Sequence, residues 1–258
     1  MNRPFQITLC IFLLTAAGCA SLGTYNAATG RREFIFIPTD QEVAMGQDIH
    51  QQLTREFKFI NSGPQLDRVR RVGRKLAQVS DRQDFEYNFY LIDKDEMNAF
   101  TIPGGRIYIF SGLLNKMRND DELASVLGHE IGHSAARHTV KKYQAAVTYQ
   151  FIGEVVLSRI SAEEQVRRIA SLSSDTLMSL IFSAYGRRDE YEADRLGLKY
   201  MSLAGYNLNG MIQMFEILNE KSEQGSVPLI LRSHPYLHDR KTAAKKEIER
   251  IKAEDAIH

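Results

Sequence analysis

Two histidines one helical turn apart are the most informative feature of the sequence. His129, Glu130 and His133 form the pattern HExxH, in which residues i and i+4 lie on one face of a helix. Both imidazoles can therefore reach one metal ion. The glutamate between them points to the same side but stays outside direct coordination, so it can take a proton from a zinc-bound water of lowered pKa. The alternative interpretation is two surface histidines with an intervening glutamate that forms a salt bridge.

A catalytic zinc ion needs three protein ligands and one open position, so the third ligand must come from elsewhere in the chain. Within residues 188–194, Glu190 and Asp194 lie at i and i+4 on one face of a predicted helix, whereas Glu192 lies on a different face. One carboxylate can bind zinc while the other accepts the free ring N–H of a liganding histidine. Acidic clusters on helices are usually solvated, so spacing alone does not separate Glu190 from the other carboxylates.

The elements that must hold these residues are two helices that approach each other closely. Gly128 and Gly132 lie inside the first helix, where each glycine costs about 1 kcal/mol relative to alanine. This cost is best explained if another element packs very near. The second helix, expected over 187–203, carries Ala193 and Gly197 and is slim enough to do so.

The remaining pattern predicts a mainly helical α+β fold with one small β-sheet of about three strands. Apolar residues recur at helical spacing over 40–59 and 64–79, and they alternate with polar residues over 85–91, as in a half-buried strand. The other predicted elements are strands at 97–102 and 106–110 joined by a glycine turn, and helices at 119–135, within 140–186, at 208–223 and at the C-terminal end. Asn119 and Glu122 form a capping-box pattern at the start of the HExxH helix.

Several motifs together resemble the M48 family of zinc metallopeptidases, the gluzincins that include a periplasmic lipoprotein protease group. They are the HExxH helix, the string EYEAD that begins at Glu190, and a preceding segment with Asn98, Phe100, Gly104, Gly105 and residues 111–114. The resemblance covers residues 97–240. It implies a zincin-type metallopeptidase domain over 39–258 with one Zn²⁺ ion, Glu190 as the third ligand, and Asp194 among the catalytic residues.

A later segment adds to this resemblance. His234 and Pro235, with Arg240 five residues beyond, are similar to the family's His-Pro-x4-Arg loop, whose histidine either blocks the open metal position or steadies the transition state. We therefore count His234 and Arg240 as catalytic candidates that could assist the oxyanion. Without the family pattern, His234 would be an ordinary loop histidine. The remaining candidates, His50, His138 and His238, are assigned no role.

The substrate side is predicted to be an exposed strand edge, because an extended peptide can be held there by main-chain hydrogen bonds without much demand on its sequence. Asn98, Ala99 and Phe100 occupy the position of the family's edge strand and are the expected substrate-binding residues. A purely structural hairpin is equally compatible with these residues.

The N-terminus has the pattern of a processing signal. Residues 1–18 carry one charge, Arg3, ahead of a short apolar stretch, and the following Cys19 resembles the lipidated cysteine of bacterial lipoproteins. We expect a signal peptide at 1–18, lipidation of Cys19 and a lipidated tether over 19–38. Ala20 favours the outer membrane over the inner one. The alternatives are an ordinary secretory signal cut elsewhere or a short anchor helix.

Composition narrows the class of function. The 258 residues are 43% apolar and 25% charged with a net charge of +1, which provides no basic field to attract nucleic acid. Two cysteines cannot form a four-cysteine zinc site. The sequence thus predicts a membrane-anchored periplasmic zinc endopeptidase acting on unfolded or misassembled envelope proteins, with envelope assembly machinery as a candidate partner. The alternative is a non-proteolytic or autoinhibited zinc-containing chaperone or assembly lipoprotein.

Overall fold

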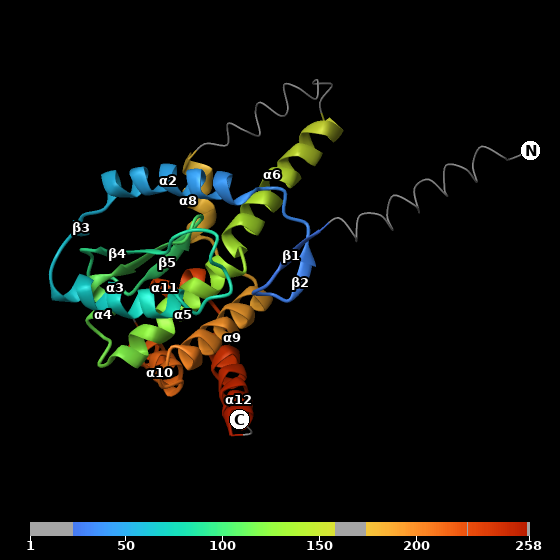
Figure 1. Ribbon diagram of the computed structural model, residues 1–258. Coiled ribbons are helices and arrows are strands. Elements are labelled where there is room, and N and C mark those ends of the chain that lie inside the picture. Colours follow the sequence, from blue (N-terminus) through green and yellow to red (C-terminus); the bar gives the residue numbers. More distant parts are fainter. Residues whose placement is uncertain (1–22, 158–173, 226, 257–258) are drawn as a thin grey trace, which may run out of the picture.

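The computed structural model describes residues 23–157, 174–225 and 227–256 (Figure 1). The predicted signal peptide and Cys19 lie outside these residues. The strands are β1 (Thr24–Asn26), β2 (Arg31–Glu33), β3 (Phe59–Ile60), β4 (Asn88–Ile92), β5 (Ala99–Ile102) and β6 (Arg106–Phe110). The helices are α2 (Thr39–Glu56), α3 (Pro64–Ala77), α4 (Ser111–Leu114), α5 (Asp120–Ala135), α6 (His138–Leu157), α8 (Ser174–Phe182), α9 (Arg187–Leu203), α10 (Asn209–Glu223), α11 (Ile230–Ser233) and α12 (Leu237–Asp255). The predicted mainly helical α+β class is confirmed.

The larger sheet has the strand order β3-β4-β6-β5. β4 and β6 run parallel, whereas β3 is antiparallel to β4 and β5 is antiparallel to β6. Three of these strands correspond to the predicted ones. β3 was not expected, because two residues are too few to show an alternating pattern. The order leaves β5, which contains Ala99 and Phe100, at one edge of the sheet.

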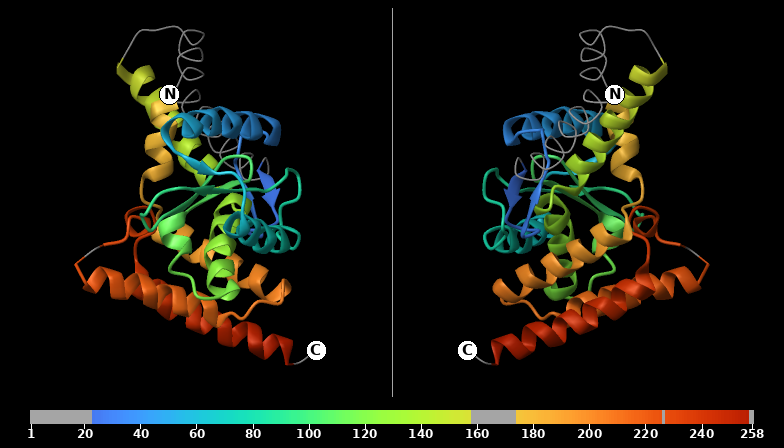
Figure 2. Two further views of the ribbon diagram at one scale, coloured as in Figure 1. Left: turned by 90° about the vertical axis from the view of Figure 1, so that its left-hand side faces the viewer. Right: turned by 90° about the vertical axis from the view of Figure 1, so that its right-hand side faces the viewer.

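Helices cover both faces of this sheet (Figures 1 and 2). α2 and α8 lie over one face, where Ile49, Leu53 and Ile181 pack against Phe100 and Tyr108. α3 and α5 cover the other face, and α9, α10 and α12 extend the larger hydrophobic core beyond α5. α5 is therefore buried between the sheet and the C-terminal helices, which places the HExxH residues in the interior.

The predicted close approach of α5 and α9 is confirmed. A methyl group at Gly132 would lie 2.7 Å from the carbonyl oxygen of Ala193, and one at Gly128 would lie 3.2 Å from that of Gly197. Contacts this short leave almost no room for a side chain. The two glycines therefore let the backbones of α5 and α9 come together.

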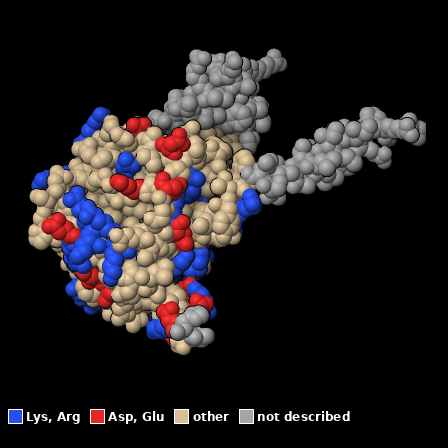
Figure 3. Space-filling model, in the orientation of Figure 1, with Lys and Arg blue, Asp and Glu red and all other residues tan. Residues whose placement is uncertain are grey.

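The N-terminal segment contains an element that the sequence did not predict. β1 and β2 form a two-stranded antiparallel hairpin inside the expected tether, with Tyr25 opposite Arg32. No helix of the described residues is long and apolar enough to cross a membrane. On the face seen in Figure 3, lysine and arginine side chains gather over α3, where Arg68 and Arg71 form ion pairs with Asp120.

Candidate metal centre

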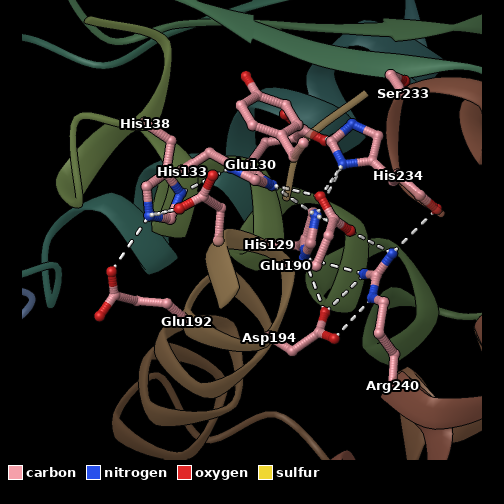
Figure 4. A network of polar contacts seen from close by, with 12 residues as sticks. His129, Glu130, His133, His138, Glu190, Glu192, Asp194, Ser233, His234 and Arg240 are labelled. Carbon is pink, nitrogen blue, oxygen red and sulfur yellow. Dashed lines mark hydrogen bonds and ion pairs between the residues drawn. The ribbon is translucent and has the colours of Figure 1, made fainter. Parts of the chain in front are cut away.

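Three segments bring four potential metal ligands together (Figure 4). α5 supplies His129 and His133, α9 supplies Glu190, and His234 follows α11. One ligand atom from each residue lies within 4.8 Å of the others, and all four side chains are buried. The two histidines predicted from HExxH thus meet the glutamate predicted from the second helix, and His234 completes the cluster.

The spacing of these atoms fits a tetrahedral divalent ion. His129 Nε2 lies 3.0 Å from His133 Nε2 and 3.1 Å from His234 Nδ1. Glu190 Oε1 lies 3.0 Å from His234 Nδ1 and 3.3 Å from His133 Nε2. Ligand atoms about 2.0–2.1 Å from a tetrahedral zinc ion are about 3.3 Å apart. The donor set of imidazoles and one carboxylate is also the kind that zinc prefers.

Glu130 is fully buried beside this cluster. Neither of its carboxylate oxygens accepts a hydrogen bond from the described residues, and His234 Nε2, 3.5 Å from Oε1, is too distant for one. A buried carboxylate without a hydrogen-bond donor is costly. Together with the buried acid Glu190, it indicates that the site is built to receive a cation and a polar ligand. Burial raises the pKa of Glu130, which suits a residue that must accept a proton near neutral pH.

The charges around the cluster set the other protonation states. Burial lowers the pKa of His133 well below its usual value, which keeps its imidazole neutral for coordination. Burial would raise the pKa of Glu190, but Arg240 and His234 outweigh this effect and hold it well below the usual range. Glu190 is therefore a carboxylate, the form that binds a metal ion.

Asp194 and Arg240 support His129 from behind. His129 Nδ1 lies 2.8 Å from Asp194 Oδ1, and the Arg240 guanidinium donates to both oxygens of Asp194 at 2.7 and 2.8 Å. Arg240 Nη1 also lies 2.5 Å from Glu190 Oε2. The guanidinium is directed at these two acids, so the geometry favours a role in holding the site over direct contact with a substrate oxyanion.

The local sequence explains how α5 is fixed. Asn119 caps the helix, and its side-chain oxygen accepts a hydrogen bond of 2.9 Å from the backbone N–H of Glu122. The Glu122 carboxylate accepts from the backbone N–H of Arg118 at 2.7 Å, one residue before the partner that a capping box would give. The helix start is therefore anchored on both sides of its cap.

The predicted substrate residues lie at the sheet edge and do not join the metal cluster. Ala99 faces the larger core, whereas Phe100 packs into the opposite core and stacks on Tyr108 with ring centroids 4.8 Å apart. The side chain of Asn98 is buried as well. Any recognition of a peptide here therefore has to use the backbone of β5.

A cavity opens beside the catalytic side of the cluster. Glu130, His129 and His234 line it on one side, and its apolar wall consists of Val126, Met211, Met214, Phe215, Leu218, Ile230 and Leu231. Such a wall suits an apolar side chain next to the reacting groups.

Two residues in contact with the cluster were not predicted. Tyr185 stacks on His133 with ring centroids 4.0 Å apart, and His138 Nδ1 lies 2.8 Å from His133 Nδ1. His138 does not continue the α5 periodicity, because Arg137 has a left-handed φ of 60° between the two helices. The only signal in the sequence is a histidine five positions after His133, and this spacing does not fit a continuous helix.

Comparisons with known proteins agree with this geometry. Residues 65–248 match the profile of Peptidase family M48. The chain is 28% identical to the mitochondrial metalloendopeptidase OMA1 of Schizosaccharomyces pombe over 231 residues, which is 88% of this chain and 65% of that protein. It is 26% identical to the beta-barrel assembly-enhancing protease of Escherichia coli K12 over 219 residues, 82% of this chain and 45% of that protein.

A plant relative gives a shorter match, since the mitochondrial metalloendopeptidase OMA1 of Arabidopsis thaliana is 32% identical over 131 residues, 51% of this chain and 25% of that protein. The chain spans about half to two thirds of the length of the first two relatives. The family profile, in contrast, covers α3 to most of α12 and includes every residue of the metal cluster. The chain belongs to peptidase family M48.

Proposed function

We propose that this protein is a zinc-dependent endopeptidase. The observation that carries the proposal is the buried cluster of His129, His133, Glu190 and His234, with the Glu130 carboxylate beside it that accepts no hydrogen bond from the described residues. Membership of peptidase family M48, and the metalloendopeptidase and protease names of the relatives, agree with it. One Zn²⁺ ion bound by His129, His133 and Glu190 would supply a Lewis acid that lowers the pKa of a bound water.

The residues around the ion have separate roles in proton transfer, ligand orientation and substrate binding. Glu130 accepts a proton from the attacking water and passes it to the amine nitrogen as the peptide C–N bond breaks. Asp194, held by Arg240, fixes the ring of His129 so that Nε2 faces the cluster. The backbone of β5 at the sheet edge offers an extended peptide a strand to pair with, and the apolar cavity receives a neighbouring side chain.

The position of His234 favours a closed resting state. Its Nδ1 lies 3.0 Å from Glu190 and 3.1 Å from His129, where a fourth ligand of a tetrahedral ion would be. A water molecule or a peptide carbonyl needs the same place. This contact supports the second candidate function, an autoinhibited zinc-containing chaperone or assembly lipoprotein, and it makes displacement of His234 a condition for hydrolysis.

The proposed substrates are unfolded or misassembled proteins of the bacterial envelope. The likeness to a protein named beta-barrel assembly-enhancing protease supports this substrate class and an association with envelope assembly machinery. The pattern of residues 1–18 and Cys19 supports a periplasmic protein held by a lipid anchor, with the outer membrane favoured by Ala20. We propose residues 39–258 as the peptidase domain that this anchor and the 19–38 segment tether.

Hydrolysis of a loosely folded substrate such as casein tests the proposed activity. We expect wild-type protein to cleave casein, a chelator to stop cleavage, and Glu130→Gln to lose about 10²–10⁴-fold in rate while it retains zinc. Glu56→Gln, an exposed glutamate in α2, is the matched control and should keep full activity. Cleavage by Glu130→Gln at the wild-type rate would remove Glu130 from the mechanism. Absence of cleavage by both wild type and His234→Ala would favour the non-proteolytic candidate.

A further inference from the structure

His133 is held from behind by a chain of polar contacts that ends in the N-terminal hairpin. His138 Nδ1 lies 2.8 Å from His133 Nδ1, and His138 Nε2 lies 3.2 Å from Glu192 Oε2. Arg31 of β2 donates to both oxygens of Glu192, at 2.8 and 3.1 Å. His138 and Glu192 are buried, with exposed fractions of 1% and 8%. In Figure 4 these two residues lie to the left of His133, on the far side of the cluster from Arg240.

The contacts determine where the ring protons lie. His133 Nε2 faces the cluster, 3.3 Å from Glu190 Oε1, so it must be unprotonated to bind an ion. The proton of the neutral ring is then on Nδ1, which donates to His138 Nδ1. His138 therefore carries its own proton on Nε2 and donates it to Glu192. Each of these contacts then has one donor and one acceptor. His133 is protonated on Nδ1 and His138 on Nε2.

The other histidine from HExxH has the same arrangement in a shorter form. His129 Nδ1 donates directly to Asp194, and Arg240 holds that carboxylate with two hydrogen bonds. On the His133 side, one imidazole is inserted between the ligand and its carboxylate, and an arginine again holds the acid. Carboxylates that accept the free ring N–H of a liganding histidine fix its orientation and raise its basicity.

We propose that His138 and Glu192 are positioning residues for the metal ligand His133, and that Arg31 couples the β1–β2 hairpin to the metal centre through them. The inference rests on the proposed zinc site. The family profile matches residues 65–248, and Arg31 lies before this range. The arginine that holds Glu192 therefore comes from a segment of this chain outside the match to the family. The hairpin would then act as part of the metal site as well as a link to the segment before it.

Zinc affinity of the purified full chain, measured by competition with a chromogenic chelator, tests the inference together with the visible spectrum of the cobalt-substituted protein. His138→Leu removes the acceptor of the His133 proton and should weaken zinc binding about 10–100-fold and alter the cobalt spectrum. His138→Asn keeps an oxygen acceptor near the position of Nδ1 and should restore most of the affinity. Partial rescue of this kind is not expected if His138 only fills space.

The hairpin contact has its own pair of variants. Arg31→Met removes the guanidinium from a side chain that is 41% exposed and should weaken zinc binding by a smaller factor, several-fold. Arg32→Met is the matched control from the same strand, because Arg32 donates to the carbonyl of Gly23 and not to Glu192. Its zinc affinity should equal that of the wild type.

Each outcome decides a separate point. If folded His138→Leu binds zinc within twofold of wild type with an unchanged cobalt spectrum, the positioning role is wrong. Should His138→Leu fail to fold, Glu192→Met takes its place, because it removes the oxygen that accepts the His138 proton, and unchanged zinc affinity and cobalt spectrum in that variant overturn the role. Equal affinities of Arg31→Met and Arg32→Met would overturn the link to the hairpin. Wild-type protein that binds no zinc would overturn the proposed function and this inference with it.

Discussion

His234 is the residue that we propose closes the metal site. Its Nδ1 contacts Glu190 at 3.0 Å, while its Nε2 lies 3.5 Å from Glu130 Oε1 and has no hydrogen-bond partner in the described part of the chain. The short contacts of the ring are thus made through Nδ1. Burial lowers the pKa of His234, but Glu190 and Glu130 outweigh it and raise the pKa above the usual value. A charged His234 is attracted to the same carboxylates that an incoming ion and its water need.

Replacement of His234 should therefore release the site. A hydrogen bond to a charged group contributes about 1.5–3 kcal/mol, so loss of the His234–Glu190 contact corresponds to about a 10- to 100-fold change in the population of the open state. We expect His234→Ala to cleave casein about 10- to 100-fold faster than wild type. His238→Ala, an exposed histidine four residues later, is the control and should leave the rate unchanged. A large loss of activity in zinc-loaded His234→Ala would mean that His234 acts in the transition state.

The individual site residues differ in how far the sequence predicts them. HExxH specified His129 and His133 because i and i+4 spacing on a helix leaves little geometric freedom. Glu190 could be separated from the other carboxylates only through the family resemblance. His138 could not be placed, since the left-handed φ of Arg137 redirects the chain between α5 and α6, and nothing in the local sequence predicts that turn.

At the scale of elements, the crossing of α5 and α9 determines whether the ligands meet. The predicted helices at 119–135 and 187–203 agree with the observed Asp120–Ala135 and Arg187–Leu203, and the glycines indicated their close approach. In contrast, β3 and the β1–β2 hairpin were missed. Strands of two or three residues are too short for periodicity, and their pairing depends on contacts distant in sequence.

A methyl group at the crossing should disturb both stability and metal binding. In Gly132→Ala the new Cβ would lie 2.7 Å from the backbone oxygen of Ala193, so α9 must shift. Overpacking of this kind costs about 1–3 kcal/mol, which exceeds the ~1 kcal/mol gained in helix propensity. We expect a lower free energy of unfolding and weaker zinc binding, measured by denaturant titration and chelator competition.

Gly186→Ala is the matched control for this test, since its Cβ would meet only Asp189 Oδ2, at an ordinary van der Waals distance of 3.6 Å. It should cost less stability and leave zinc affinity unchanged. If Gly132→Ala were as stable as the wild type with the same zinc affinity, the close helix contact would not be what aligns Glu190 with the histidines.

At the scale of the whole molecule, the proposed ion connects α5, α9 and the loop before α12. These elements border the larger hydrophobic core, so an ion that joins them should stabilise the entire fold. Binding at a free concentration 1,000 times the Kd adds about 4 kcal/mol to stability. For a domain of this size, that corresponds to a rise in Tm on the order of ten degrees.

Metal removal measures this stabilisation. We expect a chelator to lower the Tm of the wild type by that amount, and added zinc to restore it. Glu190→Gln lacks one ligand and should show a much smaller zinc-dependent shift. An equal zinc-dependent shift in wild type and Glu190→Gln would place the stabilising ion elsewhere in the protein.

The proposed membrane attachment can be tested in a bacterial host by cell fractionation. Cys19→Ala removes the predicted lipidation site, so the protein should become soluble or remain uncleaved. Cys10→Ala is the control, because residue 10 lies within the segment expected to be removed, and it should partition with membranes as the wild type does. If Cys19→Ala at mature size still partitioned fully with membranes, Cys19 would not be the anchor.

In the proposed metal site, one divalent ion is bound by two imidazoles of α5 and one carboxylate of α9. Anomalous diffraction at the zinc absorption edge from crystals of the zinc-loaded protein measures this directly. We predict a single strong peak within bonding distance of His129 Nε2, His133 Nε2 and a Glu190 oxygen. A peak that lies away from Glu190, or no peak between the two histidines in fully loaded protein, would contradict the assignment of the site.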